Sequence, residues 1–227
     1  TPSLEADNPL LKEVTVLVDQ YRYMKDVPIV APLKRDGSIT YAGRRSMVLN
    51  AVRATVCQLA MNHAPQDLHI HLVAPLAHHT DWQWLKWLPH TSSKHQGQQP
   101  DFIAYDTDSV RNLVGMLSQV IDSRRADREI SHLPHLLVII DDMELMASEV
   151  VYQTLLREGQ NFGVSTLFVA NRIDDAPGDT QAIVDISGRG QFRYIRPEIS
   201  DEEIIGYSID LLSDADADNF TRSLSGV

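Results

Sequence analysis

An uninterrupted apolar run from Leu136 to Ile140 places the strongest limit on what this chain can fold into. Strands covered on one face alternate apolar and polar residues, whereas a continuous apolar run is typical of a strand buried on both faces. A second buried strand is predicted over residues 164–170, after Gly163, which favours the left-handed conformation at which many helices end. We therefore expect both strands inside a sheet that helices cover on each side.

Strand and helix patterns alternate along most of the 227 residues. Strands are expected at 38–43, 69–74, 102–105, 136–140, 164–170 and 191–195, and helices from Ser46, from a cap at Asp108 or Ser109, and over 148–162. This alternation is typical of an α/β fold, in which a mainly parallel sheet lies between two layers of helices. The length fits a single domain over 1–227, with residues 1–9 as an entry linker and 213–224 as a C-terminal helix.

Composition excludes some classes of function. The formal net charge is −11, which argues against a nucleic-acid partner bound through the overall field of the domain. One cysteine, Cys57, excludes an internal disulfide and fits a reducing compartment. The first residue is Thr1, so the chain is interpreted as a fragment of a longer protein.

The turn after the first strand is one of two places where nucleotide chemistry is expected in such a sheet. A P-loop follows the pattern G-x-x-x-x-G-K-[ST], because glycines let backbone N–H groups surround the phosphates and the lysine reaches the outer ones. This chain has no Gly-Lys-Ser/Thr there. An anion is still a possible ligand, because a helix begins at this turn and two arginines lie beside it. The candidate anion-binding residues are Gly43, Arg44, Arg45 and Ser46.

The second place is the end of the apolar strand, where Asp141 and Asp142 follow Ile140. This is the Walker B arrangement, in which one carboxylate holds Mg²⁺ and the next polarises the attacking water. Asn171 ends the next strand, where a polar residue can sense the γ-phosphate. Many parallel strands end in Asp, so these carboxylates are catalytic candidates whose alternative role is to cap the segment from Met143.

Two other chemistries are weighed and disfavoured. Residues 102–110 fit the D-x-D-x-[TV] element of haloacid-dehalogenase-like phosphatases, with Asp106 as the nucleophile, but only about thirty residues separate it from Asp141. That spacing leaves no room for the other elements of such a phosphatase. Seven of the nine histidines lie between His63 and His95, without the spacing of a known metal motif, so no metal site is expected.

A tryptophan-rich segment carries the resemblance to a known family. Residues 62–68 (NHAPQDL) and 81–90 (DWQWLKWLPH) resemble the H-S-P-x-D-L and D-W-x-W-x-K-W-L-P-H motifs of type VII (ESX/Ess) secretion ATPases of the FtsK/SpoIIIE class. Other elements agree in order, among them Arg124-Arg125 and Leu133-Pro134-His135. The resemblance extends from about residue 8 to residue 224. The family residues are Trp82, Trp84, Lys86, Trp87 and His90, and packing of the three tryptophans is favoured over exposure to a partner.

The resemblance implies a three-layer fold like that of P-loop NTPases of the RecA/FtsK kind, with a degenerate P-loop. In the family, the matched region lies between the transmembrane helices and the first true ATPase domain of a hexameric, membrane-anchored motor for protein export. Location at the cytoplasmic face of the bacterial plasma membrane follows. The implied partners are neighbouring ATPase domains, other protomers and the membrane subunits of the secretion complex.

Two hypotheses follow from these residues and the resemblance. The first is a non-catalytic structural or regulatory domain that couples the membrane part of the motor to its ATPase domains, without a cofactor of its own. The second is a divergent nucleotide-binding ATPase domain, in which Arg44 or Arg45 replaces the lysine while Asp141 and Asp142 hold Mg²⁺ with ATP.

Overall fold

The computed structural model describes residues 13–18, 30–92, 102–126, 134–188, 192–196 and 204–225. The chain divides into two compact units, residues 1–31 and 32–227. In the first unit, residues 13–18 are helical and present exposed aliphatic side chains, including Val16 and Leu17. The linker predicted over residues 1–9 lies outside the described residues.

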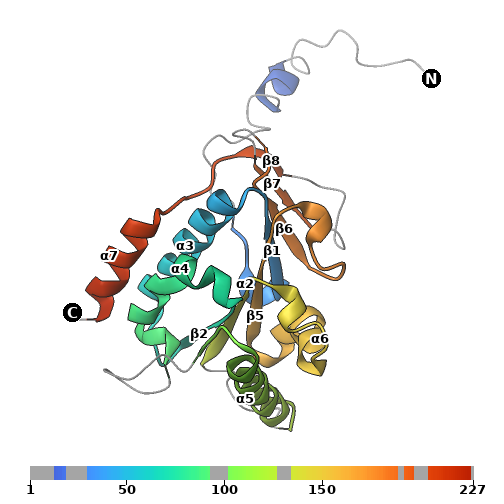
Figure 1. The fold of residues 1–227 in the computed structure, drawn as a ribbon. Helices are drawn as coiled ribbons and strands as arrows, with labels where there is room; N and C mark the ends of the chain where they lie inside the picture. Colours follow the sequence, from blue (N-terminus) through green and yellow to red (C-terminus); the bar gives the residue numbers. More distant parts are fainter. Residues whose placement is uncertain are drawn as a thin grey trace. The chain divides into compact units, whose positions relative to one another are not determined.

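The second unit is built on an eight-stranded sheet with the order β3-β2-β4-β5-β1-β6-β7-β8 (Figure 1). The strands from β3 to β6 are parallel, and β7 and β8 join antiparallel at one edge. Their bounds are β1 Ser38–Ala42, β2 Leu68–Val73, β3 Ile103–Ala104, β4 His135–Ile140, β5 Val164–Ala170, β6 Ala182–Asp185, β7 Phe192–Ile195 and β8 Ile204–Tyr207. The predicted α/β fold with a mainly parallel sheet is confirmed.

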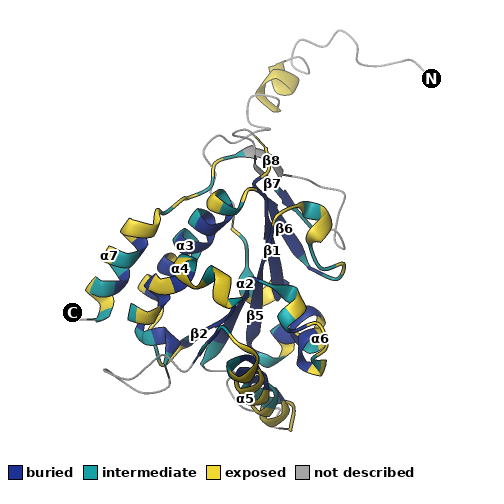
Figure 2. Ribbon diagram, viewed as in Figure 1, coloured by how far each residue is buried: buried dark blue, intermediate teal, exposed yellow. Residues whose placement is uncertain are grey.

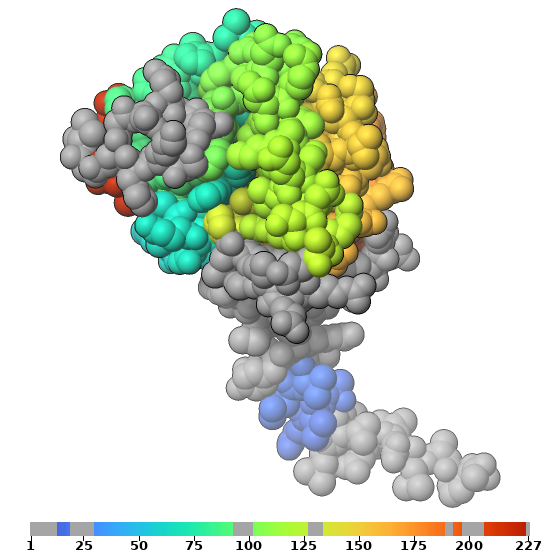
Figure 3. Space-filling view, turned by 90° about the horizontal axis from the view of Figure 1, so that it is seen from below, coloured from blue at the N-terminus to red at the C-terminus, as the bar shows by residue number. Residues whose placement is uncertain are grey.

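Helices cover both faces of this sheet, with α3, α4 and α7 on one side and α5 and α6 on the other (Figure 1). Figure 3 shows α5 and α6 side by side on their face. The α-helices are α2 Leu33–Asp36, α3 Arg45–Asn62, α4 His79–Trp82, α5 Thr107–Ala126, α6 Val150–Arg157 and α7 Asp214–Ser225. The 3₁₀ helices are η1 Leu76–His78, η2 Gln83–Trp87, η3 Pro89–Thr91, η4 Met143–Leu145, η5 Gly159–Phe162 and η6 Ile173–Asp175.

The strands β4 and β5 form the centre of the core, and every residue of β5 is buried (Figure 2). Alternate residues of β4, beginning with Leu136, pack against α5 and α6 because successive side chains point to opposite faces of a sheet. Burial on both faces explains the continuous apolar run that the sequence shows. Among the described residues, no helix combines the length and apolarity needed to cross a bilayer.

Two local predictions need correction and a third is confirmed. The helix expected over 148–162 forms α6 and then the separate 3₁₀ helix η5. The cap of α5 is Asp106, whose Oδ1 accepts from the N–H groups of Asp108 and Ser109 at 3.0 and 2.9 Å. The strand predicted over 191–195 is confirmed as β7, which runs antiparallel to β6.

Candidate functional site

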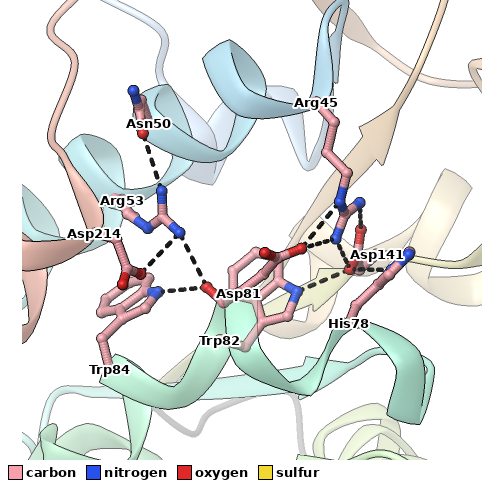
Figure 4. Close-up of polar contacts among 9 residues, drawn as sticks. All are labelled: Arg45, Asn50, Arg53, His78, Asp81, Trp82, Trp84, Asp141 and Asp214. Atoms are coloured by element: carbon pink, nitrogen blue, oxygen red, sulfur yellow. Dashed lines mark hydrogen bonds and ion pairs between the residues drawn. The ribbon is translucent and has the colours of Figure 1, made fainter.

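The candidate site lies at the carboxyl ends of the parallel strands and is centred on Asp141, which follows β4. The Asp141 side chain is 0% exposed, and its two oxygens take part in four hydrogen bonds (Figure 4). Arg45 donates from Nη1 to Oδ1 at 2.8 Å and from Nη2 to Oδ2 at 2.9 Å. His78 Nδ1 and Trp82 Nε1 bond Oδ2 at 2.9 and 2.8 Å. Oδ1 has one of these partners and Oδ2 has three, so protein groups occupy most of the roughly four acceptor positions of this carboxylate.

Arg45 reaches Asp141 from the first residue of α3. Strands β1 and β4 are not neighbours, because β5 lies between them, so their ends are about 10 Å apart at the usual strand spacing. The long arginine side chain spans this gap. It also donates from Nη2 and Nε to Oδ2 of Asp81, at 2.7 and 3.0 Å. The guanidinium therefore lies between two carboxylates, and the hydrogen bond to Asp141 is the largest of the effects that raise the pKa of Arg45.

The environment of Asp141 keeps it ionised. Burial raises the pKa of this carboxyl, but hydrogen bonds from Arg45 and Trp82 and the positive charge of Arg45 outweigh burial and hold the pKa below its usual range. Tyr105 lies nearby, and burial, with a contribution from the negative charge of Asp141, raises its pKa to about 12. The site is therefore an ion pair between a buried, ionised carboxylate and a partly exposed guanidinium.

The turn from β1 to α3 consists of two residues, Gly43 and Arg44. The Gly43 N–H donates to the carbonyl of Ala170 at 3.1 Å, and its φ of 146° lies in a region that favours glycine. A Cβ at this position would lie 2.8 Å from the backbone carbon of Ile186. Gly43 is thus required for close backbone packing, and its N–H is already bonded.

The remaining residues of the predicted nucleotide site are exposed or cap a helix. Arg44 is exposed just before α3, Ser46 is exposed in its first turn, and Asn171 is exposed after β5. Asp142 accepts a hydrogen bond from the Glu144 N–H at 3.0 Å and so caps η4. The structure therefore brings Arg45 and Asp141 together, whereas Asp142 has the capping position that the sequence left open.

The tryptophan-rich segment contributes to the site through packing. Trp82 and Trp84 are each 1% exposed, and Trp84 Nε1 donates to the carbonyl of Asp81 at 3.1 Å. Trp87 is half-buried and donates to Asp218 Oδ1 of α7 at 3.0 Å. These contacts place the segment between the carboxyl edge of the sheet and α7.

Two other predicted residues of the same segment, His90 and Lys86, differ in exposure. His90 is buried, and its Nε2 lies 2.8 Å from the carbonyl of His63. Burial lowers the pKa of His90. Lys86 is exposed, with Nζ 4.8 Å from the centre of the Trp87 ring.

Sequence reasoning missed two residues of the site: His78 and Asp81. His78 was grouped with histidines that cluster by chance, and Asp81 was noted only as part of the tryptophan-rich motif. Both follow β2, whose carboxyl end lies beside that of β4. A polar segment after a strand at this edge was the signal that could have identified them. Among the described residues, no group of acidic, histidine or cysteine side chains could hold a metal ion.

Comparison with known proteins identifies relatives in protein secretion. The chain is 24% identical over 197 residues to the type VII secretion system protein EssC of Staphylococcus aureus, covering 83% of this chain and 13% of that protein. It is 24% identical over 182 residues to the ESX secretion system protein EccC of Geobacillus thermodenitrificans, covering 77% of this chain and 12% of that protein. The chain thus spans about an eighth of the length of these relatives. No protein-family model matches it.

Solved structures agree on the fold. EssC (ATPases 2 and 3) from Geobacillus thermodenitrificans superimposes with a TM-score of 0.63 at 13% identity, over 85% of this chain and 44% of that one. The genome packaging NTPase B204 from Sulfolobus turreted icosahedral virus 2 superimposes with a TM-score of 0.50 at 10% identity, over 77% and 98% of the two chains. The fold is that of an ATPase domain.

Proposed function

Because its homologues are the EssC and EccC proteins of type VII secretion, we propose that this chain is a non-catalytic, ATPase-fold domain of a type VII secretion motor. Its role is to couple the membrane part of the motor to the downstream ATPase domains during protein export. No cofactor is assigned to the domain itself.

The pairing of Asp141 with Arg45 is the observation that supports this proposal most directly. In a P-loop ATPase the corresponding carboxylate holds Mg²⁺, and a lysine from the loop after the first strand contacts the phosphates. Here the side chain after that strand, Arg45, bonds the carboxylate itself at 2.8 and 2.9 Å. A guanidinium therefore neutralises the charge that a metal ion would otherwise neutralise.

The short turn before α3 supports the same conclusion. The P-loop motif extends over eight positions, and its backbone N–H groups surround the phosphates. Two residues join β1 to α3 here, and the Gly43 N–H is bonded to Ala170. We infer a degenerate P-loop, in which the turn serves the packing of strand against helix.

The proposed surroundings follow from the relatives. A related solved structure is described as the cytoplasmic domain of the Thermomonospora curvata type VII secretion ATPase EccC. We infer for this chain a position at the cytoplasmic face of the plasma membrane, in a hexameric motor, with neighbouring ATPase domains, protomers and membrane subunits as partners. The net charge of −11 agrees with a protein rather than a nucleic-acid partner.

Calorimetric titration of the 227-residue chain with ATP and Mg²⁺ tests the proposal. We expect no binding heat and no rise in melting temperature at millimolar nucleotide, because a ligand that binds the native state must stabilise it. The matched variants are Arg45→Ala, which frees Asp141, and Arg44→Ala, which removes an exposed neighbouring charge. Binding heat in the wild type that Asp141→Ala abolishes would overturn the proposal in favour of the divergent ATPase.

A further inference from the structure

Helix α7 packs against the tryptophan-rich segment (Figure 1). Ala217 and Thr221 of α7 are fully buried, and Thr221 Oγ1 lies 3.1 Å from the carbonyl of Trp84 and 2.9 Å from that of Ala217, which share its one proton. One turn away, Asp218 accepts from Trp87. The C-terminal helix therefore contacts the tryptophan-rich segment through the Trp84 backbone and the Trp87 side chain. The same segment supplies Trp82, which bonds Asp141.

A second connection runs through Arg53 of α3, whose side chain is 7% exposed. Its Nη2 lies 2.9 Å from Oδ1 of Asp214, the first residue of α7, and 3.2 Å from the carbonyl of Asp81 (Figure 4). The indole N–H of Trp84 donates to the same carbonyl. The Asp81 carbonyl is thus held by Arg53 and Trp84, both of which contact α7. The Asp81 carboxylate bonds Arg45.

We propose that α7 controls the Arg45–Asp141 pair, so that displacement of this helix from the tryptophan-rich segment releases Asp81 and opens Asp141 to solvent. The inference rests on the coupling role proposed above. It identifies the residues through which a change at α7 would reach Asp141. The continuous path is α7, Arg53 and Trp84, Asp81, Arg45 and Asp141, and each step is a contact shown in Figure 4 or a hydrogen bond of α7. A partner that binds α7 thereby alters the carboxyl edge of the sheet without touching it.

The only cysteine of the chain is a built-in reporter of α7. Cys57 lies on α3 and is 6% exposed, in a shallow apolar depression that it shares with Leu212 before α7 and Phe220 within it. Burial raises the pKa of its thiol to about 11, which keeps the reactive thiolate scarce. Displacement of α7 uncovers this thiol, so its labelling rate by a disulfide reagent measures the displaced state.

The first experiment weakens the contacts of α7 and measures the effect on the surroundings of Asp141. Thr221→Val removes the hydroxyl that bonds Trp84, and Asp214→Asn removes the charge that faces Arg53. We expect both to increase Cys57 labelling and to shift the Trp82 indole N–H resonance, which reports the bond to Asp141. Asp216→Asn is the matched control, because it removes an equal charge from the same turn, where Asp216 bonds Ser213. Its labelling rate and its Trp82 resonance should stay at the wild-type values.

The reverse experiment separates control from simple packing. Coupling between two sites is reciprocal, so breaking the pair must loosen α7 by the same factor. Asp141→Asn is expected to raise Cys57 labelling roughly fivefold or more, the lower range of such couplings. If Asp141→Asn loses its near-ultraviolet circular dichroism, the milder Trp82→Phe replaces it.

Two outcomes would overturn the inference. One is unchanged Cys57 labelling in the Asp141 and Trp82 variants while the α7 variants raise it, which would leave α7 as packing alone. The other is an unshifted Trp82 resonance in the α7 variants. ATP binding by the wild type would instead overturn the non-catalytic function and leave the reciprocal coupling standing, so the two failures are distinguishable.

Discussion

The two ends of strand β1 are secured by the same chemistry. At the amino end, Asp36 is 2% exposed and accepts from Arg196 Nη2 and Tyr194 Oη, each at 2.8 Å. At the carboxyl end, Asp141 is 0% exposed and accepts from Arg45 and Trp82. Each end therefore has a buried carboxylate, an arginine and an aromatic hydrogen-bond donor.

The two clusters differ in the elements that they connect. The Asp36 cluster ties α2 to the antiparallel strand β7, and it joins elements that meet at the edge of the core. The Arg45–Asp141 pair continues through Asp81 to α7. In open α/β sheets, ligands bind outside the carboxyl ends of the strands. The Arg196–Asp36 pair therefore has a structural role at the amino end of β1. The Arg45–Asp141 pair lies at the carboxyl end, where ligands bind in such sheets.

Removal of each carboxylate gives the largest expected effect. Asp36→Ala and Asp141→Ala should each lower the free energy of unfolding by about 3–5 kcal/mol, because each breaks a buried ion pair and removes the acceptor of an aromatic donor. Arg45 keeps Asp81 as a partner, so the lower end of this range is expected for Asp141→Ala. Urea denaturation measures both. Asp142→Ala, the neighbouring capping residue, should cost only about 1 kcal/mol. A neutral or stabilising Asp141→Ala would break the comparison, since that behaviour is typical of a catalytic carboxylate retained at the expense of stability.

A pH series tests whether Asp141 acts as an ionised partner of Arg45. Its folded pKa is lowered, so its contribution to stability is complete above the unfolded value of about 3.9 and is lost as pH falls through the folded pKa. The difference in free energy of unfolding between wild type and Asp141→Asn should therefore be constant from about pH 5 to 7 and shrink below about pH 4. A difference that persists at low pH would mean that the side chain acts through its shape alone.

The sequence predicts the fold and one half of the site well. Buried parallel strands have a local apolar pattern, and Asp141 follows one of them, so its position was visible. The partner of that carboxylate was not, because Arg45 lies 96 residues away and its direction depends on how short the turn after β1 is. The Asp36–Tyr194 bond joins residues 158 positions apart and left no local pattern at all.

The tryptophan-rich segment shows a second limit of sequence reasoning. Its composition identified it as important, with packing as the favoured interpretation, and Trp82 and Trp84 are indeed buried. What composition could not show is that the Trp82 indole N–H bonds Asp141, because that requires β2 and β4 to be neighbours in the sheet. Pairing between strands determines which loops are neighbours, and the sequences of the loops do not indicate that pairing.

Removal of the aromatic hydrogen-bond donors, Tyr194 and Trp82, should lower the free energy of unfolding by smaller and more similar amounts. Tyr194→Phe removes only a hydroxyl and should cost about 1.5–3 kcal/mol, the usual range for a hydrogen bond to a charged group. Trp82→Phe should cost at least as much, because it also leaves unfilled volume beside a fully buried site. Denaturation of both variants in urea provides the measurement. Equal stability of Trp82→Phe and wild type would show that the indole contributes packing only weakly and its hydrogen bond not at all.

The glycines beside the two clusters give the smallest expected difference, about 1 kcal/mol between them. Gly43 and Gly37 both have positive φ, at 146° and 73°. A Cβ on Gly43 would meet backbone atoms of Ile186, whereas one on Gly37 would meet the flexible side chain of Gln160, which can move. Gly43→Ala should therefore cost about 2–3 kcal/mol and Gly37→Ala about 1–2 kcal/mol. If Gly43→Ala were tolerated better than Gly37→Ala, the turn into α3 would have room to rearrange and could then open around a phosphate.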